Sequence, residues 1–476
     1  MRRTLLIINF RYIFLYDMRT EKDIIGELEL PDGALYGINS LRAKDNFTLN
    51  YRKTNPRLIR AIVTVKKAAA LTWAGLERDR ESGEAGAKKF DAIASACDEL
   101  LSAPDDSELF NGAFITDALQ GGAGTSTNMN VNEVIANLAL RGQGKETGSY
   151  HIIHPLDDVN RGQSTNDVYP TALRIASILS LRSLSDSCAK LQESLQRKEN
   201  EYDGVKKLGR TELMDAVPVT LGAEFGAYAQ GIARDRWRLY KIEERLRQVN
   251  IGGAAVGLLD TKDRERRALH HKYQAGIIEK LRELTGIGLA LSEYPMDITQ
   301  NNDVFVEVSG LLKALSVNLL KVAGDFRLMN SGPGGGIGEL KLAPMQAGST
   351  IMPGKVNPVI AEMTMQAAIK AQANDYSICA AASRGEFELN AFLPLIADAL
   401  LESLSLLERT VFLFRTKCVE TLTANLERCK SNLEAAPYFA ASYSPLIGYD
   451  TVSRIIADSP GCNADEILEK LAAVRR

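Results

Sequence analysis

Residues 305–329 read FVEVSGLLKALSVNLLKVAGDFRLM, and this stretch decides the fold class of the chain. Its large apolar side chains recur at alternating spacings of three and four residues, at Phe305, Val308, Leu312, Leu315, Leu319, Val322, Phe326 and Met329. Such an a/d heptad seam, sustained over more than three heptads, is typical of a long helix buried in a bundle.

Four further stretches extend this helical pattern. A second seam comprises Leu393, Ile396, Leu400, Leu404, Leu407 and Val411. We also expect long helices at about 170–200, 222–249 and 357–384, with Pro170 near the first helix start, where its missing N–H costs little. Five long central helices predict an all-α fold with an elongated bundle. Because seams of this length often continue across subunits, we expect an oligomer.

The composition is that of an ordinary globular protein. Of 476 residues, 45% are apolar, and 57 Lys+Arg against 60 Asp+Glu give a net charge of −3. This balance argues against a nucleic-acid binder. No stretch approaches the roughly 18 apolar residues of a membrane helix. The six scattered cysteines indicate reduced thiols in a cytoplasmic protein, and the four histidines make a His-rich metal site unexpected.

The N-terminal segment 1–17, MRRTLLIINFRYIFLYD, differs in character from the rest of the chain. It begins like a secretory signal, but Arg11 interrupts the apolar run and no small-residue cleavage site comes after it. From Met18 onward the chain resembles the start of a globular domain. We interpret residues 1–17 as an N-terminal extension from an over-long translation start, with a targeting segment as the alternative.

Polar or glycine-rich segments interrupt the helical pattern. They are QGGAGTSTNMNVNE (120–133), HPLDDVNRGQSTND (154–167), GRTELMDAVP (209–218) and NSGPGGGIGELKLAPMQAGSTIMPGKVNP (330–358). The last contains Gly354-Lys355, but its spacing from Gly348 is wrong for a phosphate-binding loop, and Val356 occupies the Ser/Thr position. An irregular loop of this length is usually functional.

These segments are rich in neutral hydrogen-bonding side chains. Each Ser, Thr or Asn could be a helix cap. Together, hydroxyls, amides and one lysine suit a small carboxylate substrate, whose oxygens accept hydrogen bonds. We interpret Asp157, Asp158 and Asp167 as helix-start charges favoured by the helix dipole, and no metal site is expected.

In these segments the chain resembles a known family. GSTIMPGKVNP (348–358), followed by Glu362, is similar to the G-S-S-x-x-P-x-K-x-N signature of the aspartase/fumarase superfamily. The other three segments resemble its active-site segments in the right order, and the similarity extends from about Thr20 to 444–449. QGGAGTS is similar to the aspartate ammonia-lyase version, whereas HPLDDVN is closer to the fumarase version.

The resemblance implies a fold and a reaction. The fold is a three-domain helical lyase, here 18–158, 159–412 and 413–476, whose central five-helix segments form a twenty-helix core in a homotetramer. Each active site would draw on three subunits. The reaction is anti-elimination of ammonia, or an amine, from an aspartate-like amino acid to fumarate or a related acid, through an aci-carboxylate. No cofactor, nucleic acid or membrane partner is implied. Fumarate hydratase and a non-catalytic helical scaffold are the alternatives.

The resemblance also assigns roles to residues. Ser349 would be the catalytic base, on a loop that closes over the substrate, and Glu212, Glu362 and Lys355 are the other catalytic candidates. A serine needs a donor-rich pocket for that task, which backbone N–H groups and Lys355 would provide. Hydroxyls would hold the carboxylate next to the abstracted proton: Thr125, Ser164, Thr165 and Thr350. The second carboxylate would be held by Thr211, Lys355 and Asn357, and the leaving amine by Asn166.

Two positions depart from the family pattern. Thr350 replaces the usual second serine and keeps a hydroxyl. Glu212 replaces a histidine that contacts a substrate carboxylate and pairs with a glutamate, matched here by Glu362. An anionic Glu212 would repel a carboxylate, and Glu362 nearby would favour protonation of one acid. Either Glu212 is neutral, or the pocket accepts a neutral or cationic group; we favour the latter, which implies a modified or non-dicarboxylic substrate.

Overall fold

The computed structural model describes residues 4–9, 12–258, 262–436, 438–462 and 464–475. The chain divides into two compact units. Unit 1 comprises Met1–Arg182, Lys241–Gly310 and Ala373–Ser405, and unit 2 comprises Ser183–Tyr240, Leu311–Gln372 and Leu406–Arg476. Most described residues are helical, which confirms the predicted all-α class; the predicted three-domain boundaries stay a prediction.

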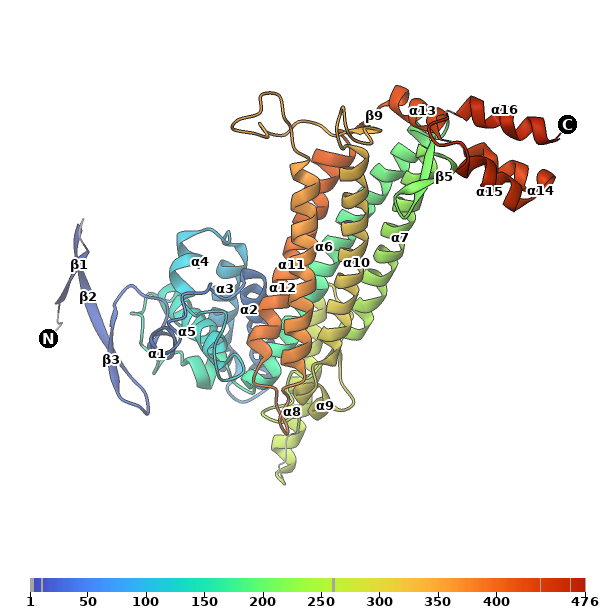
Figure 1. The fold of residues 1–476 in the computed structure, drawn as a ribbon. Helices are drawn as coiled ribbons and strands as arrows, with labels where there is room; N and C mark the ends of the chain where they lie inside the picture. Colours follow the sequence, from blue (N-terminus) through green and yellow to red (C-terminus); the bar gives the residue numbers. More distant parts are fainter. Residues whose placement is uncertain (1–3, 10–11, 259–261, 437, 463, 476) are drawn as a thin grey trace. The chain divides into compact units, whose positions relative to one another are not determined.

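Five long helices dominate the chain, as predicted (Figure 1). They are α6 (Thr165–Glu201), α7 (Leu221–Leu246), α10 (Asp303–Met329), α11 (Val359–Ala382) and α12 (Leu393–Phe414). All fourteen seam residues predicted on α10 and α12 are buried, none more than 5% exposed. In unit 2, the ring of Phe326 on α10 packs against those of Phe225 on α7 and Phe414 on α12.

Two further helices of unit 1, α2 (Pro56–Arg78) and α8 (Arg264–Thr285), are as long as α12, and the other described elements are shorter. Unit 1 also contains strands β1 (Thr4–Asn9), β2 (Tyr12–Lys22), β3 (Glu27–Pro31), β6 (Gln248–Val249) and β7 (Ala290–Leu291). Its other helices are α1 (Ile38–Asn46), α3 (Gly83–Ser102), α4 (Glu108–Ala113), α5 (Thr125–Gly142), α9 (Pro295–Gln300) and a π-helical turn (Pro155–Val159).

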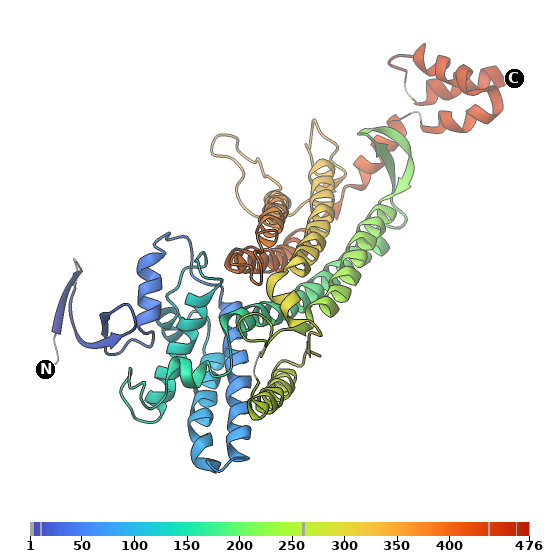
Figure 2. The ribbon, with the colours of Figure 1, turned by 90° about the horizontal axis from the view of Figure 1, so that it is seen from below.

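Unit 2 adds an antiparallel hairpin of β4 (Lys206–Thr211) and β5 (Met214–Thr220), and a short pair of β8 (Leu340–Lys341) with β9 (Thr423–Ala424). A π-helical turn (Arg415–Val419) and α13 (Leu426–Ala435) precede the C-terminal segment. That segment is a small helical cluster, seen in red in Figure 2, of a 3₁₀ turn (Tyr438–Tyr443), α14 (Ser444–Ile447), α15 (Tyr449–Ala457) and α16 (Ala464–Arg475). Its core contains Ala440, Val452, Ile467 and Leu471.

Pro170 lies one turn further into its helix than the sequence indicated. α6 begins at Thr165, so that the proline stands in the second turn. Its missing N–H leaves the carbonyl of Asn166 without its usual helical donor. The side chain of Asn250 donates to that carbonyl at 3.0 Å and replaces the lost bond.

The N-terminal strands form an antiparallel sheet in the order β1-β2-β3. β1 pairs with the first half of β2, from Thr4 opposite Asp17 to Asn9 opposite Tyr12. The second half of β2 pairs with β3, beginning with Met18 opposite Pro31. The prediction that residues 1–17 are an extension falls partly outside the described residues and stays a prediction.

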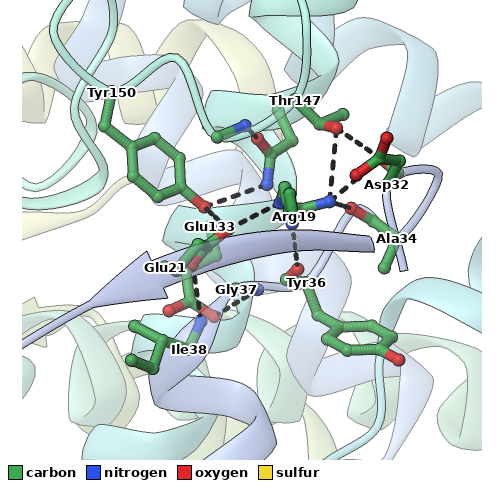
Figure 3. Close-up of polar contacts among 12 residues, drawn as sticks. Arg19, Glu21, Asp32, Ala34, Tyr36, Gly37, Ile38, Glu133, Thr147 and Tyr150 are labelled. Atoms are coloured by element: carbon green, nitrogen blue, oxygen red, sulfur yellow. Dashed lines mark hydrogen bonds and ion pairs between the residues drawn. The ribbon is translucent and has the colours of Figure 1, made fainter. Parts of the chain in front are cut away.

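The residues just after Met18 and a carboxylate of α5 both bind the segment that leads into α1 (Figure 3). Arg19 donates to Glu21 at 2.8 Å and to the carbonyls of Pro31, Asp32, Ala34 and Tyr36. Glu21 accepts from the N–H of Ile38, and Glu133 on α5 accepts from the N–H of Gly37, both at 2.8 Å. Two carboxylates therefore bind the free N–H groups where α1 begins.

Among the helices of the described residues, none combines the length and the apolar character that a bilayer crossing requires.

Candidate active site

The segment 330–358 joins α10 to α11 in unit 2 and is irregular, as predicted, apart from the two residues of β8. Near its start, Glu339 is fully buried and binds Arg210 at 3.0 Å, Lys207 at 3.1 Å and Asn432 at 3.0 Å. Burial raises the pKa of Glu339, but the hydrogen bonds from Arg210 and Asn432 and the charge of Lys207 together hold it below its usual value. This network ties the loop to the β4–β5 hairpin and to α13.

Ser349 lies in a tight turn within this loop. Its Oγ accepts hydrogen bonds from the N–H of Met352 at 2.8 Å and of Ile351 at 3.2 Å. The turn is closed by the N–H of Gly348, which donates to the carbonyl of Lys355 at 3.0 Å. A Cβ at Gly348 would approach that carbonyl oxygen to 2.5 Å, so that the turn requires glycine. Two N–H groups directed at one hydroxyl oxygen stabilise negative charge on it.

A cavity of 610 Å³ is lined by the end of this turn, Gly354 and Lys355, whereas Ser349 is not among its described lining residues. Its lining includes three of the predicted residues, Lys355, Asn357 and Glu362, together with Arg327 and Lys341. Arg327 forms an ion pair with Glu362 at 3.6 Å. These lining residues comprise three cationic side chains and one carboxylate, and this excess of positive charge favours an anionic ligand. The sequence reasoning missed Arg327 and Lys341, because neither belongs to a motif.

Lys355 and Asn357 differ in how firmly they are held. Asn357 donates to the carbonyl of Gly348 at 2.8 Å and is half-buried. Lys355 is exposed, as is Thr350 next to Ser349. The reactive part of the loop is therefore open to solvent in the single chain.

Thr211 and Glu212 occupy the tip of the β4–β5 hairpin, which the sequence did not predict. Thr211 pairs with Met214, and the two turn residues, Glu212 and Leu213, have φ values of +54° and +67°. Both threonine and glutamate are exposed, and neither belongs to the described lining of the cavity that contains Glu362. The predicted proximity of Glu212 to Glu362 stays a prediction.

The other predicted residues lie in unit 1, where two helix starts meet. Thr125 is the first residue of α5; it is exposed, and its hydroxyl donates to the carbonyl of Gly122 at 2.7 Å. Gly124, just before it, has φ of +91°, and a Cβ there would come within 2.3 Å of the Tyr169 ring on α6. Glycine at this position therefore allows the start of α5 to pack against α6.

Ser164, Thr165 and Asn166 form the start of α6. Ser164 Oγ accepts from the N–H of Asn166 at 3.2 Å, while Asp167 accepts from the N–H of Ser164 at 3.0 Å. This pair resembles a capping box, in which Ser164 caps the helix and Asp167 in the first turn binds back to the N–H of the cap residue. Asp157 and Asp158 likewise lie in the first turn of the π-helical segment.

Thr165 and Asn166 are engaged by neighbouring segments. The hydroxyl oxygen of Thr165 accepts from Asn128 on α5 at 3.0 Å, and Asn166 donates to the carbonyl of Ala255 at 2.8 Å. Asp167 is buried, accepts from the N–H groups of Gly252 and Ala254, and has its pKa raised by burial to about 7. The start of α6 is thus a rigid group of polar side chains.

The cationic cavity at the end of the serine turn agrees with the family resemblance of the sequence, and so does the second group of hydroxyls at the starts of α5 and α6. A sequence model of a family described as "Lyase" matches residues 26–373. The chain belongs to this lyase family.

Proteins of known function are similar to this lyase over nearly its whole length. The aspartate ammonia-lyase of Pseudomonas aeruginosa is 42% identical over 92% of this chain and 89% of its own. That of Helicobacter pylori strain J99 is 41% identical over 93% and 91%, and that of Bacillus subtilis is 38% identical over 93% and 90%.

Solved structures share the fold of the lyase. A Brucella melitensis crystal structure described as fumarate lyase:delta crystallin has a TM-score of 0.85 and 40% identity, covering 95% of this chain and 99% of that one. A class II fumarase from Schistosoma mansoni has a TM-score of 0.86 and 28% identity, covering 96% and 95%. The resemblance to the aspartase/fumarase superfamily is therefore confirmed.

Proposed function

We propose that this lyase eliminates ammonia from L-aspartate to give fumarate, with Ser349 as the base. The observation that supports this most is the turn in which two N–H groups point at Ser349 Oγ and whose end lines the cationic cavity. The relatives that are 38–42% identical over more than nine-tenths of the chain are aspartate ammonia-lyases.

The chemical step is an anti-elimination. Ser349 Oγ, as the alkoxide, takes the proton from the carbon next to one carboxylate, and the C–H electron pair enters that carboxylate as an aci-carboxylate. As the electrons return, the C=C bond forms, the C–N bond breaks and ammonia leaves. The two N–H groups at Ser349 stabilise the alkoxide, because they favour the charged form of the oxygen.

The binding groups stabilise the charge that develops. The aci-carboxylate has an additional negative charge, so that hydroxyl donors bind it more tightly than the substrate and lower the barrier. Those donors are Thr125, Ser164, Thr165 and Thr350. The second carboxylate is held by Thr211, Lys355 and Asn357, and the amine by Asn166. Glu362 keeps Arg327 in place through their ion pair.

Assembly of the site requires loop movement and further copies of the chain. Ser349 is half-buried and Lys355 is exposed, so that closure of the loop over the substrate excludes water from the base. A homotetramer in which one site takes residues from three subunits completes the binding set. The balanced charge and scattered cysteines fit a cytoplasmic enzyme.

The test is an assay of purified protein with L-aspartate, in which fumarate absorbance and ammonia release are followed together. Both products form at equal rates in the wild type, and Ser349→Ala abolishes both. Ser383→Ala, an exposed serine at the end of α11, is the matched control and retains activity. L-malate, which a fumarate hydratase would convert, gives no fumarate. Ammonia release that persists in Ser349→Ala, or silence of the wild type, contradicts the proposal.

A further inference from the structure

Lys66 on α2 is a lysine buried in the interior of unit 1, with no exposed surface. Its ammonium donates to the side-chain oxygens of Asn160 at 2.7 Å and Gln163 at 3.0 Å. Burial lowers its pKa to about 7, an effect that the charge of the buried Asp167 opposes. Burying an ammonium group costs free energy, so that a lysine at this position indicates a specific role.

The ammonium dictates which way the neighbouring amides face. An ammonium has only donors, so that in this form Lys66 binds the oxygen of Asn160. The NH₂ group of Asn160 donates to the carbonyl of Gln163 at 3.1 Å, which favours the same orientation whichever form Lys66 takes. The same oxygen of Asn160 accepts from Asn128 at 3.2 Å and from Asn132 at 3.3 Å. Both asparagines must therefore present their NH₂ groups, because a reversed amide would place two oxygens against each other.

The orientation of Asn128 in turn sets the role of Thr165. Its NH₂ group also donates to Thr165 Oγ1 at 3.0 Å. Once the hydroxyl oxygen accepts this bond, the hydroxyl hydrogen remains for another acceptor. Within the described part of the chain, the oxygens of Asn128 and Asn132 are buried without a hydrogen-bond partner. The arrangement thus fixes the direction of the donors while leaving two buried acceptors unsatisfied.

We propose that Lys66 and Asn128 are positioning residues that fix the Thr165 hydroxyl as a hydrogen-bond donor to the substrate carboxylate. An ionised carboxylate can only accept, so that a hydroxyl held in the donor direction binds it without reorientation. The inference rests on the proposed function, in which Thr165 binds the carboxylate.

The test compares two asparagines of α5 that are equally buried, each 1% exposed. Asn128→Asp reverses the bond, because the new carboxylate accepts from Thr165 and removes its hydroxyl from the substrate. Asn130→Asp is the matched control: Asn130 bonds the backbone of Ile115 and Ala113, both at 3.0 Å, and not Thr165. The probe is succinate, an unreactive dicarboxylate, measured as a competitive inhibitor of ammonia release from L-aspartate.

We expect Asn128→Asp to raise the inhibition constant of succinate and the KM for aspartate by about tenfold or more, as for a lost hydrogen bond to a charged group. Asn130→Asp changes both by less than twofold. A structural defect alone would lower the active fraction, and hence kcat, without changing an inhibition constant. Equal inhibition constants in the two variants would overturn the inference.

A double-mutant cycle isolates the proposed route through Thr165. In a Thr165→Val background, Asn128→Asp adds less than a twofold change in the inhibition constant, because the group on which it acts is gone. Independent, multiplying effects would overturn the inference. If Asn128→Asp does not fold, Asn128→Leu replaces it, since it removes the donor without adding a charge. If the wild type releases no ammonia from aspartate, the proposed function itself is refuted. If the wild type is active but the two variants do not differ, only the inference about Lys66 and Asn128 fails.

Discussion

The two groups of candidate residues are held in opposite ways. At the start of α6, Thr165 is only 9% exposed, and a chain of buried hydrogen bonds leads from it through Asn128 and Asn160 to Lys66. In the loop 330–358, the hydrogen bonds that the described residues make to the Ser349 side chain come from two N–H groups of its own turn, and Lys355 is exposed.

This difference matches two different tasks. A group that stabilises developing charge must already point in the right direction, because reorientation during the reaction costs free energy. A base that works best without water must be able to approach after the substrate has bound. The buried amides provide the first property, and a turn that is closed mostly by its own backbone provides the second.

The largest effect is expected where the loop is fixed, at Glu339. Glu339→Gln removes the carboxylate that Arg210 and the buried Lys207 share. Because Lys207 keeps its ion pair with Glu224 at 2.8 Å, the loss is partly compensated and destabilises unit 2 by about 3 kcal/mol, the lower end for breaking a buried ion pair. The thermal midpoint should fall by several degrees. Glu434→Gln, which removes a surface pair with Lys430, is the control and should leave the midpoint nearly unchanged. Equal midpoints in the two variants would show that the loop is not anchored at this point.

The effect of Glu339→Gln depends on pH, with a definite sign. The pKa of Glu339 lies below its ordinary value of 4.5 in the folded chain, despite burial, because of Arg210, Asn432 and Lys207. Its contribution to stability is therefore complete above pH 4.5 and is lost as the pH falls through the lower folded pKa. The gap between the midpoints of wild type and variant should close below pH 4.5, and a gap that widens there would contradict the assignment.

Lys355 should show the next largest effect, on activity rather than on stability. Lys355 is the one lysine within 348–357, and in the proposed function it binds the second carboxylate of the substrate. Lys355→Met removes this positive charge, so that kcat/KM for aspartate should fall by about 100-fold. The thermal midpoint should not move, because the side chain is exposed. Lys430→Met, on the surface of α13, serves as the control. A lower midpoint for Lys355→Met would mean that the loop is a structural element rather than an open one.

The sequence predicted those parts of the fold that depend on local periodicity. The seam from Phe305 to Met329 is buried because helix geometry places every third or fourth residue on one face, whatever the partner. The β4–β5 hairpin was not predicted, because its turn residues, Glu212 and Leu213, lack the Asn-Gly signal of positive φ. Helix α8 was not predicted either. Its first half is mostly polar, and its few buried positions, Tyr273 among them, give too weak an apolar pattern.

The buried network could not be read from the sequence for a different reason. Lys66 and Lys67 are adjacent, yet the first has no exposed surface and the second forms an ion pair with Asp98 at 2.5 Å. Which lysine faces inward depends on the amides of Asn160 and Gln163, more than ninety residues away. Ser349, Thr165 and their neighbours could be named as candidate site residues because a whole motif is visible in the sequence. Arg327 could not, because its place in the cavity depends on tertiary packing.

The smallest effect is expected at Glu212, which lies outside both groups. Because the side chain is exposed at the hairpin tip, water and salt screen its repulsion of a carboxylate, and Glu212→His should raise kcat/KM for L-aspartate by only about fivefold. Histidine tolerates the positive φ of this position better than most residues, so that the hairpin should survive. Glu212→Gln separates loss of charge from gain of an imidazole.

The measurement is the ratio of kcat/KM for aspartate to that for amino acids lacking the second carboxylate. If Glu212 selects against a carboxylate, both variants shift the ratio toward aspartate, and the histidine variant shifts it further because an imidazolium attracts the anion. An unchanged ratio would contradict a role for Glu212 in specificity. The preference between substrates would then depend on the cationic cavity, whose lining contains one carboxylate, Glu362, and three cationic side chains, Arg327, Lys341 and Lys355.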